Sequence, residues 1–313
     1  MLPAAVLFVA SVALAIALVM SLARGPLLDA LGRLAPRPRI RWLFGAIATP
    51  LGAGAIALAL ALGHCVVPLL IGLDDDCRGV TGAGCAFCPL LPASAGAAAW
   101  LLSAVVTLPV VRQAVRSGRG AYLARRARAR LRTVASMGSD GVWRVPGAGA
   151  FVLGWPDAVV CIGEDLARDL GADAVRAVAA HEDEHRLRGD VWLRGLARLL
   201  ASAHLPGTGR ALLSALDLAI EQTCDERACE AVADPLIVAQ ALLDVARLQD
   251  HDGGMNCVPA SLDARVEALC VPTTHTRALP SAVGALVALA AIALLLDHQI
   301  HKAAETLTHF VVR

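Results

Sequence analysis

Long apolar runs without charged residues alternate with charged segments along this chain. Residues 2–22, 42–62 and 90–111 are each apolar over about the 20 residues that a helix needs to cross the hydrocarbon core of a bilayer. A fourth run, 279–296, ends at Asp297. The first run exceeds the roughly 7–15 apolar residues of a signal peptide and has no basic segment before it, which favours a retained span. The pattern therefore predicts four transmembrane helices.

In the segment between the third and fourth runs, apolar and polar residues alternate with the periods of strands and amphipathic helices, as in a folded domain. Residues 146–154 and 157–162 are alternating or β-branched and lie between glycines and prolines, which predicts two strands. Apolar residues then recur at helical spacing over 174–188, 191–203, 210–233 and 236–249. Asp173 is a candidate N-cap of the first helix, and Gly189 is its stop signal. We therefore expect residues 113–277 to form one α+β domain inserted into a helical membrane protein.

Composition and charge indicate where in the cell the protein and its predicted domain lie. Hydrophobic residues make up 57% of the chain and charged residues 18%, whereas soluble domains have about 25% charged residues. Residues 24–41 hold five arginines against one acid, and 112–132 hold eight arginines and no acid, whereas 74–76 are three aspartates. Because positive residues stay on the cytoplasmic side, we expect a multi-pass protein of the inner (plasma) membrane. Its inserted domain is then cytoplasmic, and both chain ends are extracytoplasmic.

This topology divides the chain into three parts. Residues 1–112 hold three spans with an extracytoplasmic loop at 64–89, and 113–277 form the cytoplasmic domain. Residues 278–313 hold the fourth span and a short tail. The arginines of 112–132 could also indicate nucleic-acid binding, but Tyr122 is the only aromatic residue among them. We therefore expect contact with the lipid bilayer, including anionic lipid, and no direct contact with nucleic acid.

The cysteines fit the same topology. Four of them fall in the predicted outer loop, where disulfides persist: Cys65, Cys77, Cys85 and Cys88. The spacing does not choose among the three possible pairings. A metal or redox sensor built from His64, the three aspartates and Cys85-x-x-Cys88 is the alternative for this loop.

The first helix of the cytoplasmic domain carries the motif His181-Glu182-Asp183-Glu184-His185. Residues four apart share a helix face, so both imidazoles can bind one zinc ion. Glu182 is then next to a ligand and can take the proton of a water molecule that attacks a carbonyl group. The alternative is an ordinary charged, solvated turn, but the apolar residues just before the motif indicate that this helix is partly buried.

A third ligand distinguishes these two interpretations, because catalytic zinc has three protein ligands and one open position. Glu221 and Asp225 share a face of the third predicted helix, so Glu221 can bind zinc while Asp225 orients a ligand histidine. Glu226 and Glu230 are rival ligands. Cys224 faces away from Glu221 and is expected to be a small packed residue.

Together with Arg188-Gly189-Asp190 and Glu221-x-x-Cys224-Asp225-Glu226, the motif resembles the integral-membrane zinc metallopeptidases of the BlaR/MecR antibiotic-sensor family. That family places its peptidase domain in the cytoplasm between the third and fourth of four spans. Its specific motifs match only about residues 150–230 here. The resemblance implies a zincin-like metallopeptidase domain with Zn²⁺ bound by His181, His185 and Glu221, Glu182 as general base and Asp225 as a supporting residue.

The resemblance also implies a role in signal transduction, by cleavage of a protein or peptide substrate such as a transcriptional repressor or the chain itself. The sensor members continue into a large penicillin-binding domain, whereas only 297–313 follow the fourth run here, so sensing through such a domain is not expected. HtpX-like quality-control proteases share the motif but insert spans between the histidines and the third ligand. Here that segment is short and contains Arg194, Arg198 and Arg210, which disfavours this alternative.

Two non-enzymatic functions stay open beside the endopeptidase: a signal transducer that contains zinc but does not catalyse, and a membrane scaffold without metal. Glu182 favours the enzyme, because a structural zinc site needs no carboxylate beside its ligand. Candidate oxyanion donors are His204, His251, His275 and Arg265, although surface positions are expected for the histidines. Trp143 and Trp155 can line a peptide groove or pack in the core.

Overall fold

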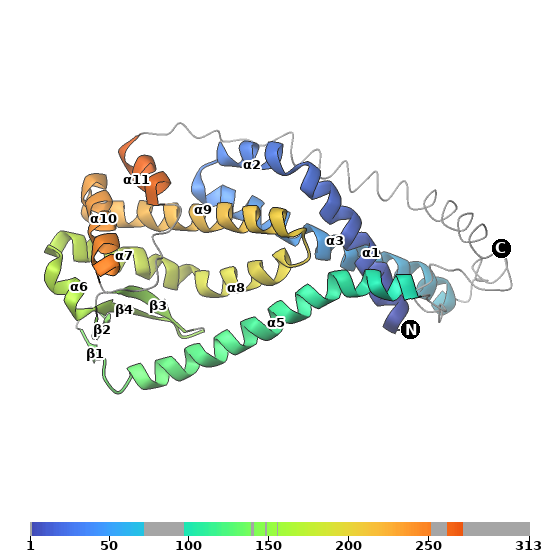
Figure 1. Cartoon of the computed structure of the whole chain (residues 1–313), viewed down its shortest axis with the longest axis horizontal. Helices are drawn as coiled ribbons and strands as arrows, with labels where there is room; N and C mark the ends of the chain where they lie inside the picture. The colour runs from blue at the N-terminus through green and yellow to red at the C-terminus, as the bar shows by residue number, and fades with distance from the viewer. Residues whose placement is uncertain are drawn as a thin grey trace.

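The computed structural model describes residues 2–71, 97–138, 141–147, 149–154, 156–251 and 262–271, which form a mostly helical structure with one small mixed sheet (Figure 1). The N-terminal helices are α1 (Leu2–Leu22), α2 (Arg24–Gly32), α3 (Pro36–Ile71) and α5 (Ala97–Leu131). The strands are β1 (Ser136–Met137), β2 (Trp143–Val145), β3 (Ala150–Leu153) and β4 (Val159–Gly163). They are followed by α6 (Glu164–Asp169), α7 (Ala172–Arg188), α8 (Asp190–Ala201), α9 (Pro206–Val232), α10 (Pro235–His251) and α11 (Leu262–Cys270).

Candidate membrane helices are fewer in the structure than in the sequence pattern. Within the described residues, Pro36–Ala59 of α3 is long and apolar enough to cross a bilayer. Val9–Leu22 and Arg24–Gly32 form a second candidate only if they are taken together, and they are bent by 66° at the break between them. The predicted fourth run, 279–296, and the start of the third, 90–96, lie outside the described residues. One or two spans are therefore supported, and the four-span arrangement stays a prediction.

Helices α1, α3 and α5 pack together at one end of the molecule, with small residues between them (Figure 1). Ala10 and Ala13 of α1 are buried against Val106 of α5. A side-chain carbon on Gly54 of α3 would lie 2.9 Å from Val9 Cγ1, so these two helices approach very closely. Five other large apolar residues of α5 point outward instead and are each at least 58% exposed; this apolar stripe consists of Leu101, Val105, Leu108, Val111 and Val115.

The largest apolar core among the described residues joins the N-terminal helices to α8 and α9. Leu43 and Ile47 of α3 are fully buried in one cluster with Leu212 and Leu216 of α9. At the closed end of the α8–α9 hairpin, the His204 ring donates a hydrogen bond from Nε2 to the Ile47 carbonyl oxygen, at 3.1 Å. The expectation of a surface position for His204 is therefore wrong, since its side chain is buried in this contact. The first half of α9 is thus held against α3.

The sheet supports the histidine helix from the other side. Its strand order is β1-β2-β4-β3, with β2 and β4 parallel and the other pairs antiparallel. The two predicted strands are confirmed as β3 and β4, and the shorter β1 and β2 were not predicted. Val160 and Ile162 of β4 pack against Val175 and Val178 of α7, so one face of this helix is buried on the sheet. Strand β3 forms the sheet edge beside α7.

The ends of α7 show one correction to the sequence prediction. The N-cap is Gly171, and Asp173 instead lies in the first turn, where it accepts a 2.6 Å hydrogen bond from Arg176. The helix therefore starts two residues earlier than predicted. Its predicted end is confirmed: Gly189 has φ +67°, the left-handed conformation that glycine adopts without strain.

We expect Leu43→Ala to destabilise the packing of α8 and α9 on the N-terminal helices, because the side chain belongs to the core shared by α3, α8 and α9. A buried Leu→Ala change typically costs about 2–5 kcal/mol. The measurement is the free energy of unfolding in detergent, from denaturant titration of helical ellipticity. Leu123→Ala, at a 51% exposed position of α5, is the matched control. Equal destabilisation by both variants would contradict the shared core.

Candidate metal centre

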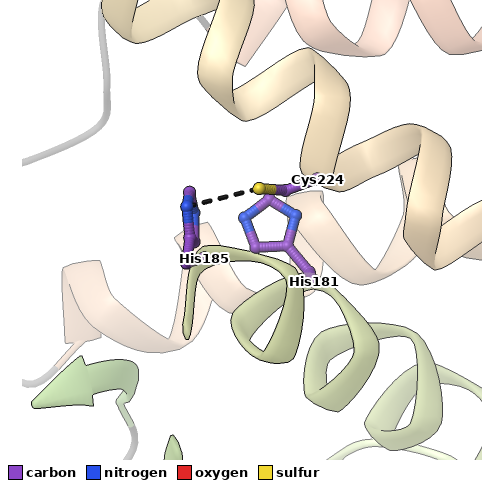
Figure 2. A group of neighbouring side chains, drawn as sticks. All are labelled: His181, His185 and Cys224. Carbon is purple, nitrogen blue, oxygen red and sulfur yellow. Dashed lines mark hydrogen bonds between the residues drawn. The ribbon is translucent and has the colours of Figure 1, made fainter. Parts of the chain in front are cut away.

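Helix α7 presents both histidines of the motif to α9 (Figure 2). Because they are four residues apart, His181 and His185 lie one turn from each other on the same face. Their ring centroids are 4.9 Å apart and the ring planes are 82° apart. The two side chains are only 12% and 8% exposed. The motif is therefore no solvated surface turn.

Helix α9 places a carboxylate opposite the two rings. Glu221 Oε2 lies 3.4 Å from His181 Nε2, and Glu221 Oε1 lies 3.6 Å from His185 Nε2. These distances bring together the three residues predicted as metal ligands. The rivals do not compete, because Glu226 and Glu230 are exposed and Glu230 accepts a hydrogen bond from Arg227.

The other nitrogen of each ring faces a second carboxylate. His185 Nδ1 is 2.8 Å from Asp190 Oδ2 at the start of α8. His181 Nδ1 is 3.0 Å from Asp225 Oδ1, an ion-pair contact whose angle falls short of a hydrogen bond. A carboxylate beside Nδ1 favours a proton on that nitrogen and leaves the Nε2 lone pair free for a metal ion. Asp225 thus lies beside His181, the position predicted for it, and Asp190 contacts the His185 ring.

Cys224 offers a competing ligand. His181, His185 and Cys224 form a buried group whose possible ligand atoms all lie within 4.8 Å of one another, so these three residues can hold a metal ion. The sulfur, however, lies 3.2 Å from His185 Nδ1, the nitrogen that Asp190 already contacts (Figure 2). Burial, with Asp190 nearby, raises the pKa of the Cys224 thiol, which disfavours the thiolate that a metal needs. Its predicted burial is confirmed, but its contact with His185 was not anticipated.

The pKa values of the two carboxylates Glu221 and Glu182 are shifted in opposite directions. Burial alone would raise the pKa of Glu221, but His181 and Arg265 outweigh it and hold this pKa well below its usual range. Burial likewise opposes protonation of His181, yet Asp225 and Glu221 raise its pKa to about 9. Burial raises the pKa of Glu182 above its usual value, which brings this carboxylate closer to the range of an effective general base.

A cavity of about 380 Å³ opens onto these groups. His181, Glu182, His185 and Glu221 are among the residues that line it. Another part of the lining is apolar and comes from edge strand β3 and helix α10, with residues that include Phe151, Val152, Ala241, Leu242 and Val245. The cavity therefore combines ionisable groups with an apolar surface next to a free strand edge.

Two arginines contact Glu221 and were not predicted to do so. Arg194 of α8 donates hydrogen bonds to Glu221 and to Asp217. Arg265 of α11 contacts both Glu221 and Asp225, so the predicted oxyanion candidate is engaged with carboxylates here. No spacing rule relates either arginine to the histidine motif, so these contacts had no signal in the sequence. Helix α11 follows residues 252–261, which lie outside the described part of the chain.

Several predicted features fall outside the part of the chain that the structure describes. The residues outside the described part of the chain, or whose side chains are not described, are His64, Cys65, Cys77, Cys85, Cys88, Trp155, His251, His275 and the tail from 272 onward. Trp143 lies in β2 and is partly buried. The outer-loop disulfide and the sensor alternative stay predictions.

The donor set fits a divalent ion of intermediate softness. Two imidazoles, which give up a proton when they bind a metal, and one ionised carboxylate are the ligands that zinc and similar ions accept in sites with an open position. Both histidines are oriented by carboxylates, as in many metal sites. Comparisons of the chain with protein-family models, curated proteins and solved structures find no match.

Proposed function

We propose that this chain is a membrane-embedded, zinc-dependent endopeptidase that hydrolyses peptide bonds of a regulatory protein, or of itself, at the cytoplasmic face. The observation that carries the proposal is the orientation of the two rings. Both Nε2 atoms face Glu221, at 3.4 and 3.6 Å, while both Nδ1 atoms face other carboxylates. The cavity that these residues line would give a water molecule and a substrate access to the same groups.

His181, His185 and Glu221 would hold the metal, with Cys224 as a packed neighbour. Zinc would supply a Lewis acid and would lower the pKa of a water molecule at its open position. Glu182 lines the same cavity and follows the first ligand directly. Its carboxylate accepts the proton of the attacking water and returns it to the leaving nitrogen. The raised pKa of Glu182 suits this exchange, because the group must both take up and release a proton.

A peptide suits the cavity. Strand β3 is a sheet edge, and Ala150, Phe151 and Val152 of this strand line the cavity. An extended peptide can add to such an edge by backbone hydrogen bonds, which positions a carbonyl group without a sequence requirement. The apolar wall from α10 then favours an apolar side chain next to the cleaved bond. These features support an endopeptidase acting on an extended segment.

The proposed location rests on the N-terminal helices. We place α1, α3 and α5 in the plasma membrane, with 279–296 as a fourth span and the site in the cytoplasm. The apolar stripe of α5 and the small residues between α1 and α3 support this arrangement. Large apolar side chains outside and small ones inside are typical of helices in lipid and unusual for a soluble bundle. A role in signal transduction is part of the same proposal, in line with the resemblance to BlaR/MecR peptidases.

One observation favours a second candidate, an HtpX-like quality-control protease. The α8–α9 hairpin lies between the histidines and Glu221 in the chain, and its closed end packs against α3. HtpX-like proteases insert their additional spans at this same point of the chain, between the histidines and the third ligand. The hairpin here, however, contains Arg198 and Arg210 on exposed positions. Cleavage of one regulatory protein favours the signalling peptidase, and degradation of many damaged membrane proteins favours the alternative.

The test of the proposed function is metal-dependent cleavage by the purified full chain in detergent. We expect hydrolysis of extended peptides with apolar residues to stop after removal of metal with a chelator and to return on addition of zinc. The measurement is mass spectrometry of the products. A non-catalytic transducer would bind zinc but release no peptide fragments, and fragments that persist after complete metal removal would contradict the proposal.

A further inference from the structure

The guanidinium group of Arg265 uses all three of its nitrogens on two carboxylates of α9. Nε donates to Asp225 Oδ2 at 2.8 Å and Nη2 donates to Asp225 Oδ1 at 2.6 Å. Nη1 lies 2.9 Å from Glu221 Oε2. The side chain is only 6% exposed, so these contacts are shielded from solvent. A planar guanidinium matches such paired acceptors, whereas an ammonium group cannot.

The oxygens that Arg265 contacts are also those nearest to His181. Asp225 Oδ1 accepts from Arg265 Nη2 and lies 3.0 Å from His181 Nδ1. Glu221 Oε2 contacts Arg265 Nη1 and lies 3.4 Å from His181 Nε2. One guanidinium therefore fixes a carboxylate oxygen on each side of the same imidazole ring.

Arg265 also offsets a local concentration of negative charge. Glu221 and Asp225 are one turn apart on α9 and both are largely buried, so without a cation their carboxylates would repel each other. Arg194 contacts only Glu221 of the two, from α8. Of these two arginines, only Arg265 therefore contacts both carboxylates.

We propose that Arg265 is a positioning residue of the metal centre. It holds the Glu221 carboxylate in place directly, and it sets the orientation of the His181 ring through Asp225. The proposal rests on the zinc peptidase function above. It makes α11 part of the site, although α11 carries none of the ligands. It also assigns Arg265 a role other than the stabilisation of an oxyanion, because all three of its nitrogens are engaged by the carboxylates.

The test compares zinc affinity in the full chain after metal removal, by competition with a chromophoric chelator. Arg265→Lys retains the charge but loses the paired geometry, and we expect about a 10–100-fold weaker zinc affinity, as for other groups that orient metal ligands. The visible absorption of the Co²⁺-loaded protein should change as well, because the ligand geometry changes. Arg227→Lys, on an exposed position of α9, is the control and should alter neither measurement.

A double-mutant cycle separates positioning from general stability. If Arg265 acts through Asp225, Asp225→Asn and Arg265→Lys together should weaken zinc binding by much less than the product of the single effects. Independent, multiplicative effects would overturn the proposal, as would wild-type zinc affinity and an unchanged Co²⁺ spectrum in Arg265→Lys. If Arg265→Lys does not fold, the spectrum of Asp225→Asn alone decides: an unchanged spectrum overturns the proposal. A wild-type chain that binds no zinc would instead overturn the proposed function itself.

Discussion

Replacing Glu182 by glutamine is expected to abolish peptide hydrolysis while zinc stays bound. The amide has nearly the shape of the carboxylate but cannot accept a proton from the attacking water. General-base catalysis contributes about 10²–10⁴-fold to the rate, so the hydrolysis rate should fall by at least about 100-fold. Zinc content should not change, because Glu182 lines the cavity but is not among the groups that face both Nε2 atoms. The measurements are product formation and zinc per chain in the same preparation.

Glu184→Gln is the matched control for this prediction. Glu184 lies on the same turn of α7, but it does not line the cavity. Its substitution should leave the hydrolysis rate near that of the wild type. Cleavage by Glu182→Gln at the wild-type rate would exclude Glu182 as the general base and would remove the main reason to prefer an enzyme over a zinc-containing transducer.

Glu221→Gln is expected to lose zinc, whereas Cys224→Ala is expected to retain it. Groups that only orient a ligand already contribute about 10–100-fold to metal affinity, so loss of a ligand carboxylate should weaken zinc binding by more than about 100-fold. Cys224 contacts the Nδ1 side of His185 and belongs to the packed interior of α9, so its truncation removes a small buried group and no ligand. Zinc titration of the metal-free proteins measures both effects.

Folding must be compared in the same experiment, because Glu221→Gln leaves Arg194 and Arg265 with one charged partner fewer. Loss of a partner from a buried ion pair is destabilising by itself. Helical ellipticity and the unfolding midpoint in the presence of chelator report that effect without metal. Zinc binding that is lost in Cys224→Ala and kept in Glu221→Gln would exchange the roles assigned to these two residues.

The elements that follow a local rule were predictable from the sequence. The histidine motif on a helix placed His181 and His185 on one face, and the i, i+4 spacing placed Glu221 and Asp225 on one face of α9. Gly189 ended its helix as predicted because a left-handed residue is required there. These predictions succeeded because each depends on the geometry of a single helix.

The features that depend on contacts between distant segments were not predictable. Arg265 reaches Asp225 from α11, and His204 reaches the Ile47 carbonyl from the α8–α9 hairpin, with no spacing rule that relates the partners. The core shared by α3 and α9 was missed for the same reason, because an apolar run such as 42–62 fits lipid and a protein partner equally well. Asp173 was wrongly predicted as the N-cap of α7, because an aspartate is favoured both at the N-cap and in the first turn of a helix. The N-cap is Gly171, and Asp173 lies in the first turn.

X-ray absorption spectroscopy of the zinc-loaded full chain tests the central assignment most directly, since it measures the atoms bound to the metal. The proposed ligands, His181, His185 and Glu221, predict nitrogen and oxygen neighbours at about 2.0–2.2 Å, with a light atom such as a water oxygen in the fourth position. A sulfur neighbour at about 2.3 Å would instead put Cys224 on the metal and contradict the proposed centre.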